Sequence, residues 1–308
     1  MRRRIITGTR GSKLALIQAE SVATKIREFV PHLEVTVSKI VTKGDRNHHI
    51  QLAHMEGIGI FVKELEAALS SGRIDVAVHS LKDMPTQIPQ GLCLVAVTER
   101  LDPRDVLISG GQKLAELTAG SRIGTGSLRR AVQLGACRPD LEVCSVRGNA
   151  DTRLRKVAEG ELDGVILAAA AMQRLGWQEK ITEYLPLEHF LPAVGQGALA
   201  IEARSDDWEV AELLAPLNHV PTWQSITAER AFLEALGGGC RAPIASLGTF
   251  KNGTLQLDGM VADVGTKKII RSLAKDSALS PQELGARLAQ KLLAMGADEF
   301  IAEAKGTG

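Results

Sequence analysis

The sequence has few aromatic residues and almost no net charge. Aromatic side chains make up 3% of the 308 residues, and Trp177, Trp208 and Trp223 are too scattered to form a platform on which bases could stack. The 37 lysines and arginines are balanced by 36 acidic residues, which leaves a net charge of +1. No overall field therefore draws the chain to nucleic acid or to a membrane surface, and any anion-binding site must be local.

Cysteines are few, and no long apolar run follows the start of the chain. The basic opening is followed by only two apolar residues, Ile5 and Ile6, which is too short for a signal-peptide core or a spanning helix. We therefore expect a cytoplasmic protein with no nucleic-acid or membrane partner, no metal and no disulfide framework. The cysteines, which lack metal-ligand spacing, are Cys93, Cys137, Cys144 and Cys240.

Short apolar runs alternate with segments of helical period, which is the pattern of α/β layers. Arg4–Gly8 predicts a strand, and Ser12 predicts the cap of a helix that ends before Pro31. After Pro221 the pattern changes to one helix, a run of strands and a final helix. We therefore expect two similar α/β domains facing each other across a cleft, with a small α+β domain after them. The expected boundaries are 1–98 with 196–217, 99–195, and 218–308.

A long polar stretch runs from Thr42 to Gly59 and has few apolar anchors. Connections of this length are often lids or disordered segments. As a lid, it would open together with hinges near 98–103 and 191–197.

One cysteine lies in an unusual local setting. Three glycines end a predicted helix immediately before Cys240, and Pro243 stiffens the exit. Glycines stop the helix and leave room around the sulfur. Because most buried cysteines are inert, this context alone leaves both a reactive thiol and a structural cysteine open.

Cations recur where predicted strands meet predicted helices. Ligands of open α/β sheets bind at this edge, where helix N-termini favour anions. Arginine binds a carboxylate through two parallel hydrogen bonds, so the set favours a small ligand with several carboxylates or phosphates. Ordinary surface charges are the alternative. The cations are Arg10, Lys82, Arg129, Arg130, Arg147 and Arg153.

Asp83 adds a carboxylate to these cations at a predicted strand end. It could neutralise its neighbours, or it could act as a general acid and base that stabilises a cationic intermediate. Position alone leaves both roles open.

Eight segments of the chain, in order, resemble motifs of the porphobilinogen deaminase family. The segment Glu229–Pro243, which contains Cys240, resembles the family's cofactor-attachment motif. Together the matches span nearly the whole chain, which is far more specific than any single glycine loop. The other seven are Thr9–Ala15, Phe61–Glu66, Val78–Pro85, Asp102–Asp105, Gly124–Arg130, Val146–Asn149 and Leu191–Gly197.

The resemblance implies an enzyme, the transferase hydroxymethylbilane synthase of porphyrin and heme biosynthesis. It implies α/β domains like those of periplasmic binding proteins, and a cytoplasmic monomer that takes porphobilinogen as its substrate. Cys240 would hold a dipyrromethane through a thioether. Four porphobilinogen molecules would add to this primer with loss of ammonia, and hydrolysis would release linear hydroxymethylbilane.

The resemblance also implies roles for residues at the motif positions. Asp83, with Lys82 and Arg10, would be catalytic, because a fixed carboxylate stabilises positive charge on a pyrrole and moves protons. The implied cofactor-binding residues are Cys240, Lys82, Asp83, Thr125, Ser127, Arg129, Arg130, Arg147 and Gly148. The implied substrate-binding residues are Arg10, Ser12, Arg153, Arg174 and Gln196.

Three residues depart from the family pattern: Ile58 where lysine is common, Gly126 where serine is usual, and Ala242 in place of a β-branched residue. One alternative is an inactive paralogue of the family, and only Ile58 and Gly126 support it. The other alternative is a non-catalytic, two-lobed binding protein for a polycarboxylate ligand, which would need neither Cys240 nor Asp83.

Overall fold

The computed structural model describes residues 2–41, 62–237, 243–277 and 280–306. Ile58, Cys240, Ala242 and the Thr42–Gly59 stretch lie outside these residues. Contacts divide the chain into unit 1, Met1–Leu101 with Ala198–Trp223, and unit 2, Asp102–Gly197 with Gln224–Gly308. Each unit is described by itself.

Unit 1 contains a five-stranded mixed sheet with the order β2-β1-β3-β10-β4. The central strand β3 pairs in parallel with β1 and antiparallel with β10, and β10 also pairs antiparallel with β4. The predicted strand at Arg4–Gly8 is confirmed as β1. The strands are β1 (Arg4–Thr9), β2 (Glu34–Lys39), β3 (Val76–Ser80), β4 (Leu92–Val97) and β10 (Leu199–Arg204).

Helices cover both faces of this sheet. The helix α1 (Lys13–Phe29) begins where Ser12 Oγ accepts a hydrogen bond from the Ala15 amide at 3.2 Å, as its capping position predicts. Buried side chains of α1 pack on alternate residues of β1 and β3, and α3 (Lys63–Ser70) packs with Ala77 on the other face. The remaining short helices are η2 (Leu81–Asp83), α7 (Trp208–Leu214) and η4 (Ala215–Leu217).

The first sheet of unit 2 repeats this topology with the order β7-β6-β8-β5-β9. β6 is parallel to β7 and β8, whereas β5 is antiparallel to β8 and β9. The expectation of two similar α/β folds is confirmed by this match. The strands are β5 (Asp105–Ile108), β6 (Arg122–Gly124), β7 (Glu142–Cys144), β8 (Gly164–Ala168) and β9 (Glu183–Tyr184), and the helices are α4 (Leu128–Cys137), α5 (Ala150–Ala158), α6 (Ala169–Leu175) and η3 (Gln178–Lys180).

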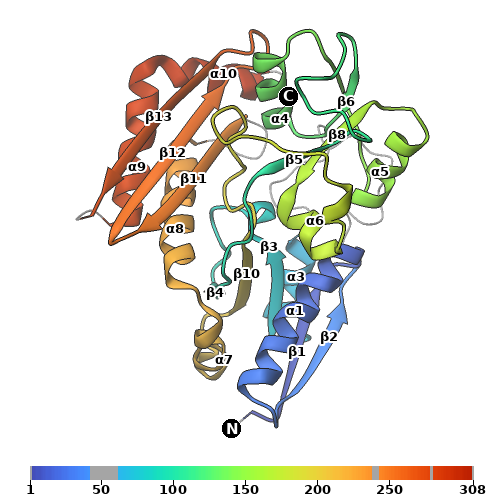
Figure 1. The fold of residues 1–308 in the computed structure, drawn as a ribbon. Coiled ribbons are helices and arrows are strands. Elements are labelled where there is room, and N and C mark those ends of the chain that lie inside the picture. The colour runs from blue at the N-terminus through green and yellow to red at the C-terminus, as the bar shows by residue number, and fades with distance from the viewer. Residues whose placement is uncertain (1, 42–61, 238–242, 278–279, 307–308) are drawn as a thin grey trace. The chain divides into compact units, whose positions relative to one another are not determined.

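Unit 2 also contains a three-stranded antiparallel sheet, β11-β12-β13, against which α9 packs (Figure 1). Its core includes Phe232, Leu257 and Leu288. Gly259 permits this packing, because a Cβ there would lie 2.7 Å from the Phe232 ring. This is the expected small α+β region. Its elements are α8 (Val220–Ala235), β11 (Ile244–Lys251), β12 (Thr254–Ala262), β13 (Ile269–Asp276), α9 (Pro281–Leu292), η5 (Leu293–Ala297) and α10 (Asp298–Gly306).

The expected domain boundaries and the expected cleft stay predictions. Among the described residues, no helix is long and apolar enough to span a membrane.

Candidate functional site

Asp83 lies on a short turn that follows directly from the central strand of unit 1. β3 ends at Ser80, and η2 then carries Lys82 and Asp83. Leu81 anchors the turn, since its side chain is buried and its amide donates to the Ala198 carbonyl at 3.1 Å. Asp83 is exposed, and within the described part of the chain its carboxylate forms no hydrogen bond or ion pair. It is therefore available to a ligand.

Arg10 and Ser12 lie in the loop between β1 and α1, and both are half-buried. The Ser12 hydroxyl oxygen caps α1. Its predicted contact with substrate stays a prediction, and the structure gives it a local role in fixing this loop.

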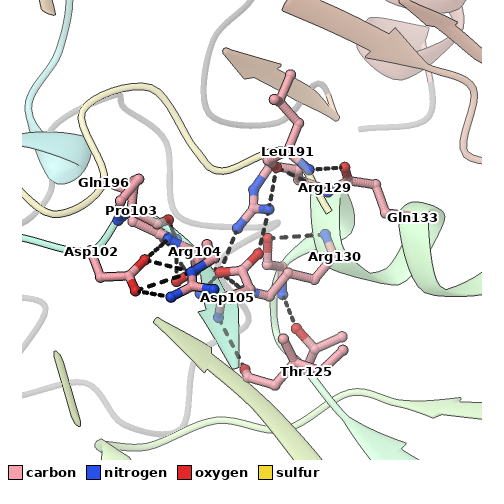
Figure 2. Close-up of polar contacts among 12 residues, drawn as sticks. Asp102, Pro103, Arg104, Asp105, Thr125, Arg129, Arg130, Gln133, Leu191 and Gln196 are labelled. Carbon is pink, nitrogen blue, oxygen red and sulfur yellow. Dashed lines mark hydrogen bonds and ion pairs between the residues drawn. The ribbon is translucent and has the colours of Figure 1, made fainter. Parts of the chain in front are cut away.

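Arg129 and Arg130 extend from the first turn of α4 and converge on one carboxylate, that of Asp105 (Figure 2). Arg129 Nη1 lies 2.7 Å from Asp105 Oδ2, and Arg130 Nη2 lies 2.7 Å from Oδ1. Asp105 is fully buried, and each arginine is only 6% exposed. Ser127 begins the helix by accepting the Arg130 amide at 3.5 Å, and Thr125 Oγ1 accepts the Ser127 amide at 3.2 Å.

The cluster carries excess positive charge. Burial alone would raise the pKa of Asp105, but attraction to Arg129 and Arg130 outweighs it and holds that pKa well below its usual range. Burial lowers the pKa of Arg129, and the neighbouring charge of Arg130 lowers it further against the opposing effect of Asp105. Two cations and one anion leave one uncompensated positive charge in a low-dielectric setting, which favours a ligand carboxylate.

Gln196 belongs to the same cluster. Its Nε2 donates to Asp105 Oδ1 at 2.9 Å and to the Pro103 carbonyl at 2.7 Å, and the residue is 1% exposed (Figure 2). Its predicted substrate contact stays a prediction. These two hydrogen bonds from Gln196 fix the start of β5 and so hold Asp105 in place.

The crossover Leu191–Gly197, which we expected to act as a hinge, is held at several points within unit 2. Its first carbonyl, that of Leu191, accepts from Arg129 Nη1 at 2.7 Å and from Gln133 Nε2 at 3.1 Å. Glu229 of α8, fully buried, accepts the Gly195 amide at 2.7 Å. These contacts tie the arginine pair to the helix that precedes Cys240 in the chain. The hinge itself stays a prediction.

Arg153 and Arg174 are partly buried cations that form no ion pair with a carboxylate of the described residues. Arg153 Nε donates to the Gly148 carbonyl at 3.0 Å, and burial, together with the charge of Arg130, lowers its pKa. Arg174 Nη2 donates to the Gly197 carbonyl at 2.8 Å, and burial lowers its pKa to about 10. Desolvated cations of this kind are stabilised by a bound anion.

Arg147 and Gly148 lie in the exposed turn before α5. Gly148 has φ +96°, a conformation that favours glycine, and a Cβ there would lie 2.9 Å from the side chain of Thr152. The turn thus brings Arg147 to the N-terminal end of α5.

The predicted site residues fall into two groups. Unit 1 holds Arg10, Ser12, Lys82 and Asp83, and unit 2 holds the arginines and their supports. Cys240 lies outside the described residues. The other three cysteines are unpaired, and burial raises the pKa of each thiol, so none of them is activated. No metal-binding group is found among the residues described.

Sequence reasoning missed Asp105 as the partner of the arginine pair. The available signal was its position, an acid that directly precedes the apolar strand residues Val106, Leu107 and Ile108. A carboxylate at the start of a buried strand requires a cationic partner.

Two family models match the chain. One, described as "Porphobilinogen deaminase, dipyromethane cofactor binding domain", matches residues 5–212. The other, described as "Porphobilinogen deaminase, C-terminal domain", matches residues 223–294.

Curated relatives named porphobilinogen deaminase match nearly the whole chain. The protein of Desulforudis audaxviator is 47% identical over 99% of both chains. The protein of Syntrophus aciditrophicus is 47% identical over 93% of this chain and 94% of its own. The protein of Geobacter metallireducens is 47% identical over 96% of this chain and 93% of its own.

Solved structures with a similar arrangement are more distant. The methionine-binding protein MetQ is 15% identical over 72% of this chain and 91% of its own, with a TM-score of 0.46. The periplasmic aliphatic sulphonate binding protein SsuA of Escherichia coli is 12% identical over 76% of this chain and 71% of its own, with a TM-score of 0.40. Likeness at this level carries no argument about function.

Proposed function

The chain belongs to the porphobilinogen deaminase family, and from that premise we propose that it is a hydroxymethylbilane synthase. In this proposal it is a transferase that joins four porphobilinogen molecules stepwise with loss of ammonia. The chain grows on a dipyrromethane carried by Cys240, and water releases the linear product. We propose that it works in the cytoplasm as a monomer.

The observation that carries this proposal is the set of desolvated cations that have no carboxylate of their own. Arg153 and Arg174 are of this kind, and the Asp105 cluster keeps one uncompensated charge. Porphobilinogen and dipyrromethane bear acetate and propionate arms, which such cations bind.

The residues therefore fit a dipyrromethane. When bound, this cofactor would supply the free pyrrole carbon that forms the first new bond, and the end of the growing chain would supply the carbon for each later one. Arg129, Arg130 and Arg147 would hold its carboxylates, with hydrogen bonds from Ser127 and Thr125 and additional charge from Lys82, and Arg153 would bind a carboxylate of the substrate. The Gly148 carbonyl accepts a hydrogen bond from Arg153 Nε at 3.0 Å, which holds the side chain of Arg153 in α5 beside the turn that carries Arg147. Arg10, Arg174, Ser12 and Gln196 are proposed to serve the substrate.

Asp83 is proposed to act on charge and protons. Its carboxylate is exposed, sits on a turn anchored by Leu81, and is not bonded to another described side chain. A fixed carboxylate in that position stabilises positive charge that develops on a pyrrole nitrogen and accepts or returns its proton. Lys82 beside it is proposed to orient anionic arms of the ligand.

The alternative, a non-catalytic binding protein for a polycarboxylate, is not favoured by the family. A direct test is to incubate the purified protein with porphobilinogen and to measure ammonia and linear hydroxymethylbilane together. The proposal expects four ammonia molecules for each product molecule, and loss of turnover in Asp83→Asn. Binding of porphobilinogen with no ammonia release would favour the alternative.

A further inference from the structure

A buried histidine and glutamate pair lies in the sheet of unit 1, and the proposed reaction uses neither residue. His79 on β3 places Nε2 3.0 Å from Oε2 of Glu202 on β10. The two side chains are 4% and 0% exposed. The register pairs His79 with Ala200 and Ala77 with Glu202, so the two side chains are diagonal neighbours on one face of the sheet.

A contribution to the stability of the fold does not explain well why this pair is buried here. No donor among the described residues reaches Oε1 of Glu202. Burial raises the pKa of Glu66 on the adjacent helix α3, and the charge of Glu202 raises it further, against the opposing effects of His79 and Lys63. Replacing a buried polar pair by apolar residues of similar volume is often neutral or stabilising. A buried carboxylate at this place therefore points to a role other than packing.

The opposite face of the same strand end is also tethered. Ser80 follows His79, and its Oγ accepts from Gln18 Nε2 at 2.9 Å and donates to Gln18 Oε1 at 3.1 Å. Gln18 belongs to α1 and is 3% exposed. The last two residues of β3 are thus fixed on opposite faces, one to β10 and one to α1. The turn with Asp83 begins at the next residue.

We propose that His79 and Glu202 are positioning residues for Asp83. This inference rests on the proposed function, in which Asp83 must meet the reacting pyrrole. Because the Asp83 carboxylate has no tether of its own among the described residues, its place depends on the strand end that carries it. Small displacements of a reacting group can lower the rate by about 100-fold. The His79 and Glu202 contact fixes that strand end laterally.

The test replaces the pair by apolar residues, H79L/E202L, which leaves no buried charge without a partner. We expect this double variant to fold with the parent's stability, to lower kcat for porphobilinogen by about tenfold or more, and to change KM by less than about twofold. The conservative variant His79→Gln retains a donor near the position of Nε2. It should keep kcat within about threefold of the parent.

A double-mutant cycle separates positioning from a structural effect. If the pair acts through Asp83, adding H79L/E202L to Asp83→Asn should lower kcat no further. Val210→Ala is the matched control, since it opens a cavity in the same unit, in α7, and should lower stability without changing kcat. A folded H79L/E202L variant with the parent's kcat would overturn the inference. The inference would also be overturned if H79L/E202L lowered kcat as much in the Asp83→Asn background as it does in the parent.

Hydrogen exchange tests the inference without turnover. The amides of Leu81 and Met84 are bonded to the Ala198 and Leu81 carbonyls, so they report the order of the turn. We expect both to exchange faster in H79L/E202L and at the parent's rate in His79→Gln. Unchanged exchange in the double variant would contradict the inference. If instead the parent released no ammonia from porphobilinogen, the proposed function would fail, and the exchange result would still decide the positioning claim.

Discussion

The two five-stranded sheets share one topology, and each buries an acidic side chain on the strand next to its central strand. The partners of these two acids differ. β10 in unit 1 and β5 in unit 2 each lie next to the central strand of their sheet and run antiparallel to it. Glu202 on β10 and Asp105 on β5 are both fully buried. Glu202 meets one histidine, whereas Asp105 meets two arginines.

The difference shows how one fold supplies two electrostatic environments. Around Asp105 positive charge exceeds negative charge, which suits the carboxylates of a bound ligand. Around Glu202 the carboxylate has a single hydrogen-bond partner among the described residues, and the nearby turn presents the exposed Asp83. The Asp105 cluster of unit 2 thus has excess positive charge, whereas the turn beside Glu202 in unit 1 presents an exposed carboxylate.

The largest expected effect comes from removing the acid of the arginine cluster. Asp105→Ala leaves two buried guanidinium groups without their counter-ion, and we expect a loss of about 3–5 kcal/mol in the free energy of unfolding. Urea denaturation measures it. Asp163→Ala is the matched control, because its pair with Arg122 is exposed and should contribute about 1 kcal/mol or less. Equal losses in the two variants would mean that the burial of the Asp105 cluster does not set it apart from an exposed pair.

The same carboxylate predicts a pH dependence. Because the pKa of Asp105 is lower in the folded protein, its contribution to stability is present above the unfolded pKa of about 3.9 and is lost as the pH falls toward the folded pKa. Urea denaturation at pH values from about 5 to about 3 should therefore show that the free energy of unfolding falls more steeply with pH in the parent than in Asp105→Asn. Parallel curves would indicate that Asp105 keeps its ordinary pKa.

Restoring the family's usual serine at Gly126 should destabilise this chain. A Cβ at Gly126 would lie 2.8 Å from the Val146 carbonyl oxygen, so backbone must move, and we expect a cost of about 1–3 kcal/mol. Gly135→Ala in α4 is the control, since its Cβ would meet nothing closer than 3.5 Å and should stabilise the helix by about 0.5–1 kcal/mol. A stabilising Gly126→Ser would mean that Val146 is not held where we find it.

Arg174→Met should have the smallest effect on stability and a clear effect on binding. The change removes a desolvated cation that has no carboxylate partner among the described residues. The free energy of unfolding should therefore change by less than about 1 kcal/mol. KM for porphobilinogen should rise about tenfold. Steady-state kinetics checks this expectation, and an unchanged KM would exclude Arg174 from the substrate site.

Much of the fold could be predicted from local signals. Ser12 marks the start of α1, as its capping chemistry indicates, and the run of strands expected after Pro221 forms the three-stranded sheet. Position at predicted strand ends marked the cations and Asp83 as candidates, and the family resemblance then implied their roles.

The polar partners could not be predicted, because they depend on contacts distant in sequence. Asp105 meets Arg129 and Arg130 only after β5 pairs with β8, and nothing near residue 105 specifies this pairing. The burial of Glu202 likewise follows from the pairing of β10 on both sides, with β3 and β4. Gln196 was assigned to substrate from its motif, and only the tertiary structure placed it against Asp105.

The most direct test of the account is the intact mass of the denatured protein, measured for the parent and for Cys240→Ser after incubation with porphobilinogen. The account predicts that the parent carries a covalent excess of at least two linked pyrrole units and that the variant carries none. A parent that keeps the bare polypeptide mass after this incubation would contradict it and would favour a binding protein or an inactive paralogue.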